Sequence, residues 1–74
     1  MGIGERITAA REAKGMTMDE LGKKVGVGKS AISRWESDKR IPRIEHLFRL
    51  SVALDVDVSD LVGTRKAPES IMAQ

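Results

Sequence analysis

The sequence predicts an all-α fold, a compact domain of five short helices. Apolar residues recur at the three- and four-residue spacing of helices in almost every segment of the 74-residue chain. Residues that start and stop helices stand between these segments, so the connections are short. No segment alternates apolar and polar residues for long enough to form a strand, since glycine interrupts residues 25–27.

The first helix is predicted from Ile3 to Lys14, where Ile3, Ile7 and Ala10 stand on one face. Gly15 ends it, because glycine adopts the left-handed conformation that commonly follows a helix. This segment is rich in Ala, Glu, Arg and Lys, which are strong helix formers.

The second helix begins at a Thr-x-x-Glu pattern, Thr17 to Glu20. In this pattern the hydroxyl and the carboxylate each bind a backbone N–H that the first helical turn leaves without a partner. Leu21 and Val25 form the apolar stripe, and Gly26 ends the helix.

The third helix, from Lys29 to Glu36, follows after a very tight turn. We expect Ile32 and Trp35 to face the core, and Trp35 to pack there rather than to stack on bases. The opposite face carries short polar and basic side chains, namely Lys29, Ser30, Ser33 and Arg34.

The last two helices follow a charged loop at residues 37–41. Pro42 presets the backbone for the first turn of the fourth helix. This helix carries apolar residues at Ile44, Leu47, Phe48, Leu50 and Leu54. A second capping pattern opens a short fifth helix, which carries Val58, Leu61 and Val62 and ends at Gly63.

Length and composition predict one domain, residues 1–63, followed by a loose tail or linker stub at residues 64–74. The chain has no cysteine, so neither a disulfide nor a thiolate metal site supports the core. It opens without an apolar leader and has no run of the ~20 apolar residues that span a membrane. We therefore expect a soluble, cytoplasmic protein without a membrane partner.

Charge is distributed unevenly along the chain. Residues 23–49 carry eight Lys or Arg and three acids, whereas residues 50–62 carry three acids and no Lys or Arg. A basic middle and an acidic end give one face a positive potential and keep the other away from a polyanion.

Two helices joined by a short, glycine-containing turn, the second with a polar outer face, are the parts of a helix-turn-helix. A major groove admits one helix, whose side chains reach base edges while the preceding helix lies across the backbone. Arg34 and Lys29 suit guanine, and Ser30 and Ser33 are short enough not to block the approach. The starts of the second and fourth helices, near Met18 and Arg43, are natural phosphate sites, with Lys39 and Arg40 beside one of them.

Four separated blocks, at residues 15–21, 25–27, 31–36 and 39–42, closely resemble the phage repressor and Cro-like helix-turn-helix family, the XRE family. The resemblance covers about residues 3 to 62. It implies a lambda-repressor-like five-helix domain of bacterial or phage origin at the nucleoid, whose third helix recognises double-stranded DNA, usually as a homodimer and most often to repress transcription.

Carried over residue by residue, the resemblance implies two sets of DNA contacts and one structural pair. The base-reading positions are Lys29, Ser30, Ser33 and Arg34, and the backbone-contacting positions are Lys39 and Arg43. Together with Thr17, Met18 and Arg40 at the phosphate sites described above, these two residues make up the predicted backbone-contacting set. Arg11 and Glu36 match a structural salt bridge. The family usually has glutamine where Met18 stands, and Ser or Thr where Gly28 stands, so we expect one polar contact fewer and a slightly weaker helix start.

Readings that need a cofactor or a metal find little support. Residues 26–31 spell Gly-x-Gly-x-x-Ala, and residues 28–30 spell Gly-Lys-Ser, but a helix rather than a strand leads into both nucleotide-type motifs. His46 is the only histidine, and we expect it to be solvated. We therefore predict no cofactor, no metal, no catalytic residue and no small-molecule substrate.

Two further expectations concern partners. Val58 and Val62 have little monomer core left to fill, and Ile41 precedes Pro42, so these three residues are the predicted homodimer interface. The alternative to DNA binding is a protein-interaction module, such as an antitoxin or anti-repressor, that uses the same fold.

Overall fold

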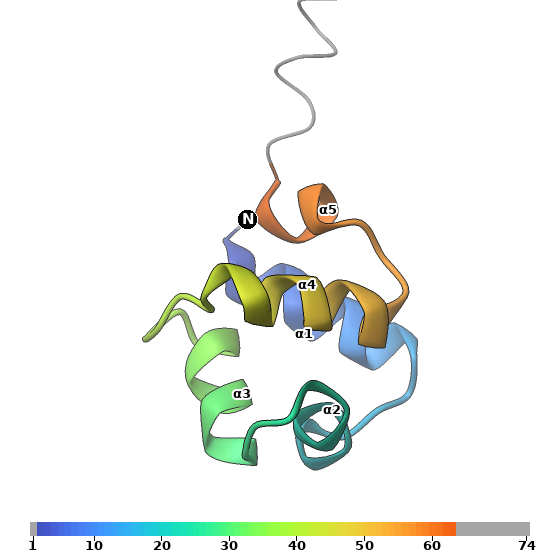
Figure 1. The fold of residues 1–74 in the computed structure, drawn as a ribbon, viewed down its shortest axis with the longest axis vertical. Coiled ribbons are helices and arrows are strands. Elements are labelled where there is room, and N and C mark those ends of the chain that lie inside the picture. Colours follow the sequence, from blue (N-terminus) through green and yellow to red (C-terminus); the bar gives the residue numbers. More distant parts are fainter. Residues whose placement is uncertain (1, 64–74) are drawn as a thin grey trace, which may run out of the picture.

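The computed structural model describes residues 2–63, and its helices in this range are drawn in Figure 1. They are α1 (Ile3–Ala13), α2 (Met18–Val25), α3 (Lys29–Glu36), α4 (Ile44–Leu54) and α5 (Val58–Val62). The predicted all-α, five-helix fold is confirmed, and this range contains no strand. The predicted tail or linker stub at residues 64–74 lies outside the described residues.

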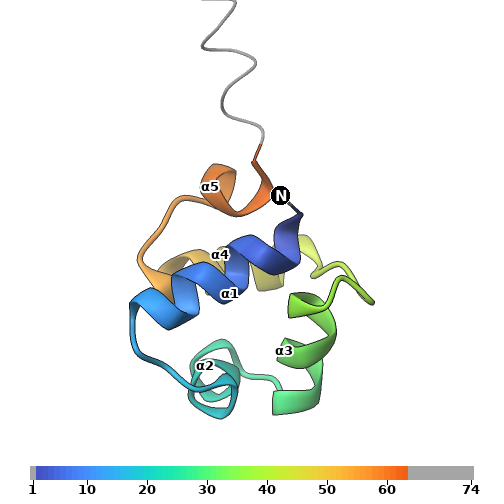
Figure 2. The same cartoon turned by 180° about the vertical axis from the view of Figure 1, so that it is seen from behind.

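The helices form a two-ended arrangement. Helices α2 and α3 lie at one end and α5 lies at the other (Figures 1 and 2). Helices α1 and α4 lie between the two ends, with α4 in front in Figure 1 and α1 in front in Figure 2. Helix α1 packs against α3 and α5, and α4 packs against α2 and α5. Each end of the molecule is therefore tied to the middle by two different helices.

One apolar cluster forms the core, and every helix contributes to it. Its buried members are Ile7, Leu21, Val25, Ile32, Trp35, Leu47, Leu50, Leu54 and Leu61. Trp35 is only 6% exposed, so its predicted place in the core is confirmed. Because all described buried side chains of the core are apolar, burial of apolar surface is the main source of stability.

The helix ends follow the predicted signals closely. Gly15 and Gly63 adopt positive φ after α1 and α5. Helix α4 differs in its start, because it begins at Ile44 with Arg43 in extended conformation as N-cap. Pro42 thus precedes the N-cap and is buried, rather than lying in the first helical turn.

Three side chains of the C-terminal half lie differently from the expectation. Val58 and Val62 are half-buried and pack against the core cluster, so the premise that they lack a core to fill is wrong. His46 is half-buried, and its ring centroid lies 5.1 Å from that of Trp35, so it is only partly solvated. The ring of His46 packs on the ring of Trp35, a contact between two helices that a helical pattern alone does not reveal.

No helix among the described residues is long and apolar enough to cross a membrane.

Candidate nucleic-acid interface

The start of α2 is held by a reciprocal cap. Thr17 Oγ1 accepts a hydrogen bond from Glu20 N at 3.1 Å, and Thr17 N donates to Glu20 Oε1 at 2.9 Å. Thr17 is exposed and its hydroxyl proton makes no hydrogen bond within residues 2–63. The first turn of α2 is therefore rigid and still has a donor that can face an anion.

The turn between α2 and α3 is tight because two glycines permit it. Gly26 caps α2 with φ of 90°, and both Gly26 N and Val27 N donate to Gly22 O, at 2.8 and 2.9 Å. A Cβ on Gly22 would lie 2.7 Å from Val27 O. The chain thus folds back onto α2 at a distance that only glycine allows, which fixes the angle between the two helices.

Helix α3 turns one apolar side inward and one polar side outward. Ile32 and Trp35 are buried, whereas the four predicted base-reading side chains are all exposed. Within residues 2–63 these four side chains make no hydrogen bond and no ion pair. The members of this outward face are Lys29, Ser30, Ser33 and Arg34.

The orientation of α3 is fixed by an ion pair with α1. Arg11 Nε donates to Glu36 Oε2 at 2.7 Å and Arg11 Nη2 donates to Glu36 Oε1 at 3.1 Å. The hydroxyl of Thr8 lies 2.9 Å from the same Glu36 Oε1, and Arg11 Nη1 donates to Met16 O at 2.8 Å. The hydrogen bond to Glu36 raises the pKa of Arg11, while burial works in the opposite direction. The pair joins the last residue of α3 to the last turn of α1.

Close contact between α1 and α3 requires a further glycine, Gly4. A Cβ on Gly4 would overlap the backbone carbonyl of Glu36, so the start of α1 lies directly against the end of α3. Gly4 N also donates to Asp38 Oδ1 at 3.0 Å. Asp38, which has φ of 63°, therefore caps α1 from the loop that follows α3.

That loop and the start of α4 carry the other three predicted contact cations, Lys39, Arg40 and Arg43. Lys39 N and Arg40 N both donate to Arg34 O, at 2.9 and 3.3 Å, so the loop folds back onto the end of α3. A hollow of about 200 Å³ lies between α3 and α4, and its lining includes Arg34, Arg40 and Arg43. Arg43 is the N-cap of α4 and its side chain makes no cap hydrogen bond.

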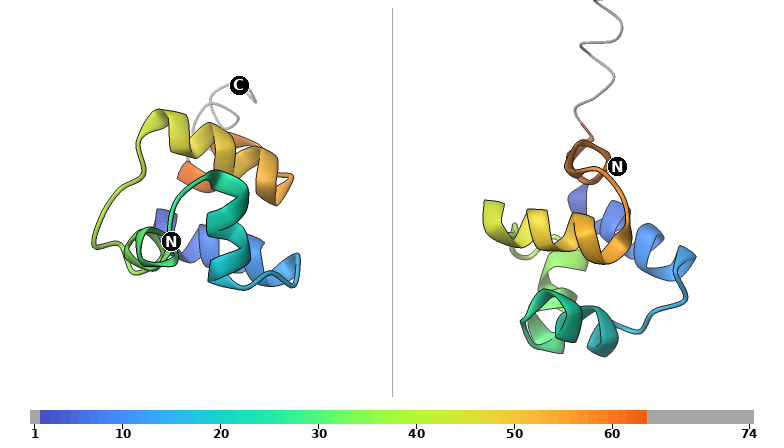
Figure 3. Two further views of the ribbon diagram at one scale, coloured as in Figure 1. Left: turned by 60° about the horizontal axis from the view of Figure 1, so that its bottom comes forward. Right: turned by 45° about the vertical axis from the view of Figure 1, so that its right-hand side comes forward.

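The fold brings three of the nine predicted contact residues together at one hollow. Arg34 from the reading set lines the same hollow as Arg40 and Arg43 from the backbone set. Figure 3 shows α2, α3 and the loop after α3 from the end that they share. Met18 is half-buried against the core, so its backbone N–H, rather than its side chain, is available at the start of α2.

Several residues that hold this surface in place were not anticipated from the sequence. Asp38 caps α1, Thr8 contacts Glu36, and Arg49 Nη1 donates to Val25 O at 3.3 Å at the end of α2. His46 covers Trp35 and lines the hollow with the arginines. Each joins segments far apart in the chain, so no local pattern marks them.

Among residues 2–63, no group of three or more His, Cys, Asp or Glu is placed to hold a metal ion. The site consists of cations, hydroxyls and backbone N–H groups. Such groups suit the binding of an anionic polymer that offers hydrogen-bond acceptors.

Comparison with known proteins places the fold and the family. The sequence profile of the helix-turn-helix family matches residues 7–61. The HTH-type transcriptional regulator SinR of Bacillus subtilis is 38% identical over 68 residues, which cover 90% of this chain and 61% of SinR. The chain therefore spans about three-fifths of that relative.

Two solved structures of such proteins with bound DNA superpose well. The P22 c2 repressor in complex with a synthetic operator has a TM-score of 0.82 at 40% identity, covering 84% of this chain and 94% of that one. SinR in complex with DNA has a TM-score of 0.75 at 42% identity, covering 80% of this chain and 95% of that one. The chain belongs to the XRE-type helix-turn-helix family of transcriptional regulators.

Proposed function

We propose that this chain binds a palindromic DNA operator as a homodimer and represses transcription, with α3 of each copy in a major groove. One observation carries the proposal. Helix α3 presents four exposed polar side chains, and none of them has a partner within residues 2–63. A polar outer face is usual on a surface helix, but this one also lies beside the hollow lined by Arg34, Arg40 and Arg43, and a major groove offers donors and acceptors that fit it.

The four α3 side chains are the proposed base readers. Arg34 is long and planar enough to bind guanine O6 and N7 with two hydrogen bonds, and Lys29 reaches guanine or a phosphate. Ser30 and Ser33 contact bases at close range, because their short side chains let α3 enter the groove. An Arg–guanine pair discriminates against a wrong base by about 1 to 3 kcal/mol.

The proposed backbone contacts flank α3 on both sides. Thr17 and the Met18 N–H lie at the start of α2, where the helix dipole favours an anion. On the other side, Arg40 and Arg43 line the hollow beside α3, and the exposed Lys39 precedes them in the loop. Phosphates held at both places would fix the register of α3 without reading sequence.

The relatives support DNA binding by a domain of this fold. The P22 c2 repressor was solved with a synthetic operator and SinR with DNA, and both share this fold over four-fifths or more of the present chain. Repression is proposed by analogy with the P22 c2 protein, which is a repressor. The palindromic site follows from the proposed homodimer, because a two-fold dimer presents two α3 helices about one DNA turn apart. A chain with this role works where DNA is, in the cytoplasm at the nucleoid.

The test begins with selection of bound sites from random DNA, followed by fluorescence anisotropy at two salt concentrations. We expect a palindromic consensus and a steep salt dependence of affinity. Arg34→Ala should lose about tenfold to a hundredfold of the preference for the selected site. Arg43→Ala should weaken binding to all DNA and flatten the slope of log affinity against log salt by about 0.9.

Lys14→Ala is the matched control. It also removes one positive charge, but Lys14 lies at the end of α1 and forms a 3.6 Å ion pair with Asp55 on an exposed surface. Its affinity and salt slope should stay close to the parent values. Binding that responds to neither sequence nor salt would contradict DNA recognition and favour a protein partner on this face.

A further inference from the structure

We propose that the solvent-facing side of α4 is the surface on which a second copy of this chain docks. The surface is an apolar stripe of Ile41, Ile44, Phe48 and Val52 with one basic and one acidic flank. This inference rests on the proposed function, because it says which surface holds the proposed homodimer together. It also replaces the half-buried valines of α5 as the centre of that contact.

The stripe is a continuous run of exposed large apolar residues. Ile44, Phe48 and Val52 are spaced by four along α4, so they lie on one face, and Ile41 precedes them in the loop. The exposed fraction is 76% for Ile41, 60% for Ile44, 57% for Phe48 and 81% for Val52. Scattered apolar residues on a surface need no explanation, but a run on one helix face marks a site of interaction.

None of the three α4 residues is needed by the core of this monomer. Leu47, Leu50 and Leu54 supply the buried side of the helix. Phe48 and Val52 do not belong to the buried cluster or to the half-buried residues packed on it. Their apolar character thus has no explanation within the described part of the chain.

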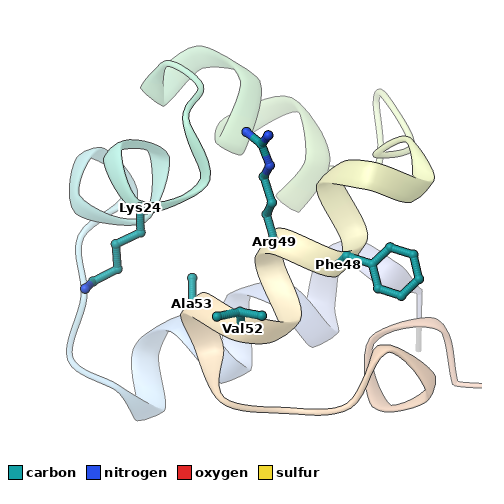
Figure 4. Close-up of a pocket in the computed structure, with 5 residues that line it drawn as sticks. All are labelled: Lys24, Phe48, Arg49, Val52 and Ala53. Atoms are coloured by element: carbon teal, nitrogen blue, oxygen red, sulfur yellow. The ribbon is translucent and has the colours of Figure 1, made fainter.

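The stripe separates two charged hollows. On the side of α2, a hollow of about 480 Å³ is lined by Lys24, Phe48, Arg49, Val52 and Ala53 (Figure 4). On the side of α5, a hollow of about 340 Å³ is lined by Ser51, Val52, Val56 and three aspartates, Asp55, Asp57 and Asp60. Val52 borders both hollows, so a basic and an acidic region meet at this residue.

This pattern is complementary to itself. A two-fold axis running along the stripe lays Val52 and Phe48 against their copies and exchanges the flanks, so each basic hollow meets the partner's acidic hollow. DNA would be repelled by the acidic flank, and an acidic peptide would satisfy only the basic one. A second copy is the occupant that satisfies both flanks and the apolar centre.

The position of Ile41 agrees with a dimer that binds DNA. Ile41 lines the hollow between α3 and α4 together with Arg34 and Arg40, so the stripe starts at the margin of the proposed DNA-contacting surface. Two copies joined there would carry their α3 helices side by side along one DNA duplex.

The test is sedimentation of the full 74-residue chain over a range of concentrations, free and on a selected palindromic site. We expect the mass to rise from 8.1 kDa towards twice that value, or binding to the palindrome to be cooperative. Phe48→Glu should raise the dimer dissociation constant, or lower the cooperativity, by at least about tenfold, since it places a charge in an apolar contact. Val52→Lys is the second variant at the stripe, and circular dichroism confirms that each variant is folded.

A matched pair of lysines tests the flanks. Lys24→Glu reverses a charge that lines the basic hollow, and should weaken dimers about three- to tenfold because like charges then face each other. Lys23→Glu makes the same change one residue away, at a side chain that is 79% exposed and outside the hollow. It should change the dissociation constant less than about twofold.

The outcomes separate this inference from the proposed function. A wild-type chain that is monomeric when free and binds the palindrome without cooperativity would overturn the docking surface, as would dimers that tolerate both stripe variants. Binding of a single copy to one half of the palindrome would remain possible with either result. Absence of sequence-specific DNA binding by the wild type would instead overturn the proposed function and leave the sedimentation result intact.

Discussion

Replacing Arg11 with alanine should destabilise the domain strongly, because Glu36 would keep its negative charge without its main partner. The Arg11 side chain is 12% exposed and the Glu36 side chain only 5%. The substitution removes two hydrogen bonds to Glu36 and one to Met16 O, and leaves the carboxylate with the hydroxyl of Thr8.

The magnitude follows from burial. Removing one partner of a fully buried pair is destabilising by about 3 to 5 kcal/mol. Because both side chains keep some contact with water, we expect the lower end, about 3 kcal/mol. A domain of this size has roughly 3 to 9 kcal/mol of stability in total, and each kcal/mol shifts its melting temperature by about 4 to 8 °C. Arg11→Ala should therefore melt about 12 to 24 °C below the parent.

The assay is thermal and urea unfolding followed by circular dichroism. Lys14→Ala is the control, because its ion pair with Asp55 joins side chains that are 45% and 85% exposed and so contributes little. The double variant Arg11→Met with Glu36→Leu should recover much of the loss, since it leaves no unpaired charge. If Arg11→Ala melts within about 4 °C of the parent, less than about 1 kcal/mol, the structural role given to the pair is wrong.

The same pair predicts how stability depends on pH. Its hydrogen bond raises the pKa of Arg11 above the ordinary value of arginine. A group whose pKa is raised on folding contributes its stability below the unfolded pKa and loses it only as pH rises through the folded one. Both lie far above neutrality, so the contribution that the charge of Arg11 makes to the parent's stability should not change between mildly acidic and mildly alkaline buffer, as measured by urea unfolding at the two pH values.

Substitutions at four further positions test how the interface is held. Asp38→Ala should lower stability by about 1 to 2 kcal/mol and weaken binding to all DNA, as it removes the cap on α1 that anchors the basic loop, while Asp38→Asn should lose less. Gly22→Ala should destabilise the fold and reduce DNA affinity, because its Cβ would lie 2.7 Å from Val27 O. Gly28→Ser should instead stabilise the fold by about a few tenths of a kcal/mol, because a Cβ there would meet only the hydroxyl of Ser30 at 4.0 Å and serine is a good N-cap residue. Thr17→Ala should lower the free energy of unfolding by about 1 kcal/mol and Thr17→Ser should restore it, so equal melting of the two would contradict the capping role.

Local signals in the sequence predicted the helices well. The first helix ends at Ala13 rather than Lys14, and the Thr17 cap, the Gly26 end and the Gly28 start lie where the sequence placed them. Capping and turn formation depend on residues a few positions apart, so the sequence contains the whole of the interaction. For the same reason, the outward face of α3 could be identified from helical spacing alone.

Contacts between distant segments could not be predicted in this way. The stripe of α4 shows the difference, because Leu47, Phe48 and Leu50 are all apolar and only packing against other helices determines which of them is exposed. Likewise, no pattern indicates that His46 covers Trp35 or that Asp38 caps α1, since these pairs lie 11 and 34 residues apart.

The amino-acid sequence by itself determined the helices, their caps and the polar face of α3, because these depend on interactions within one or two helical turns. The tertiary structure decided which apolar residues are left in contact with water, how Arg40 and Arg43 come to lie beside α3, and that Val58 and Val62 pack against the core. The physical reason is that burial is a property of three-dimensional packing: a side chain is removed from water only by segments that the fold brings to it.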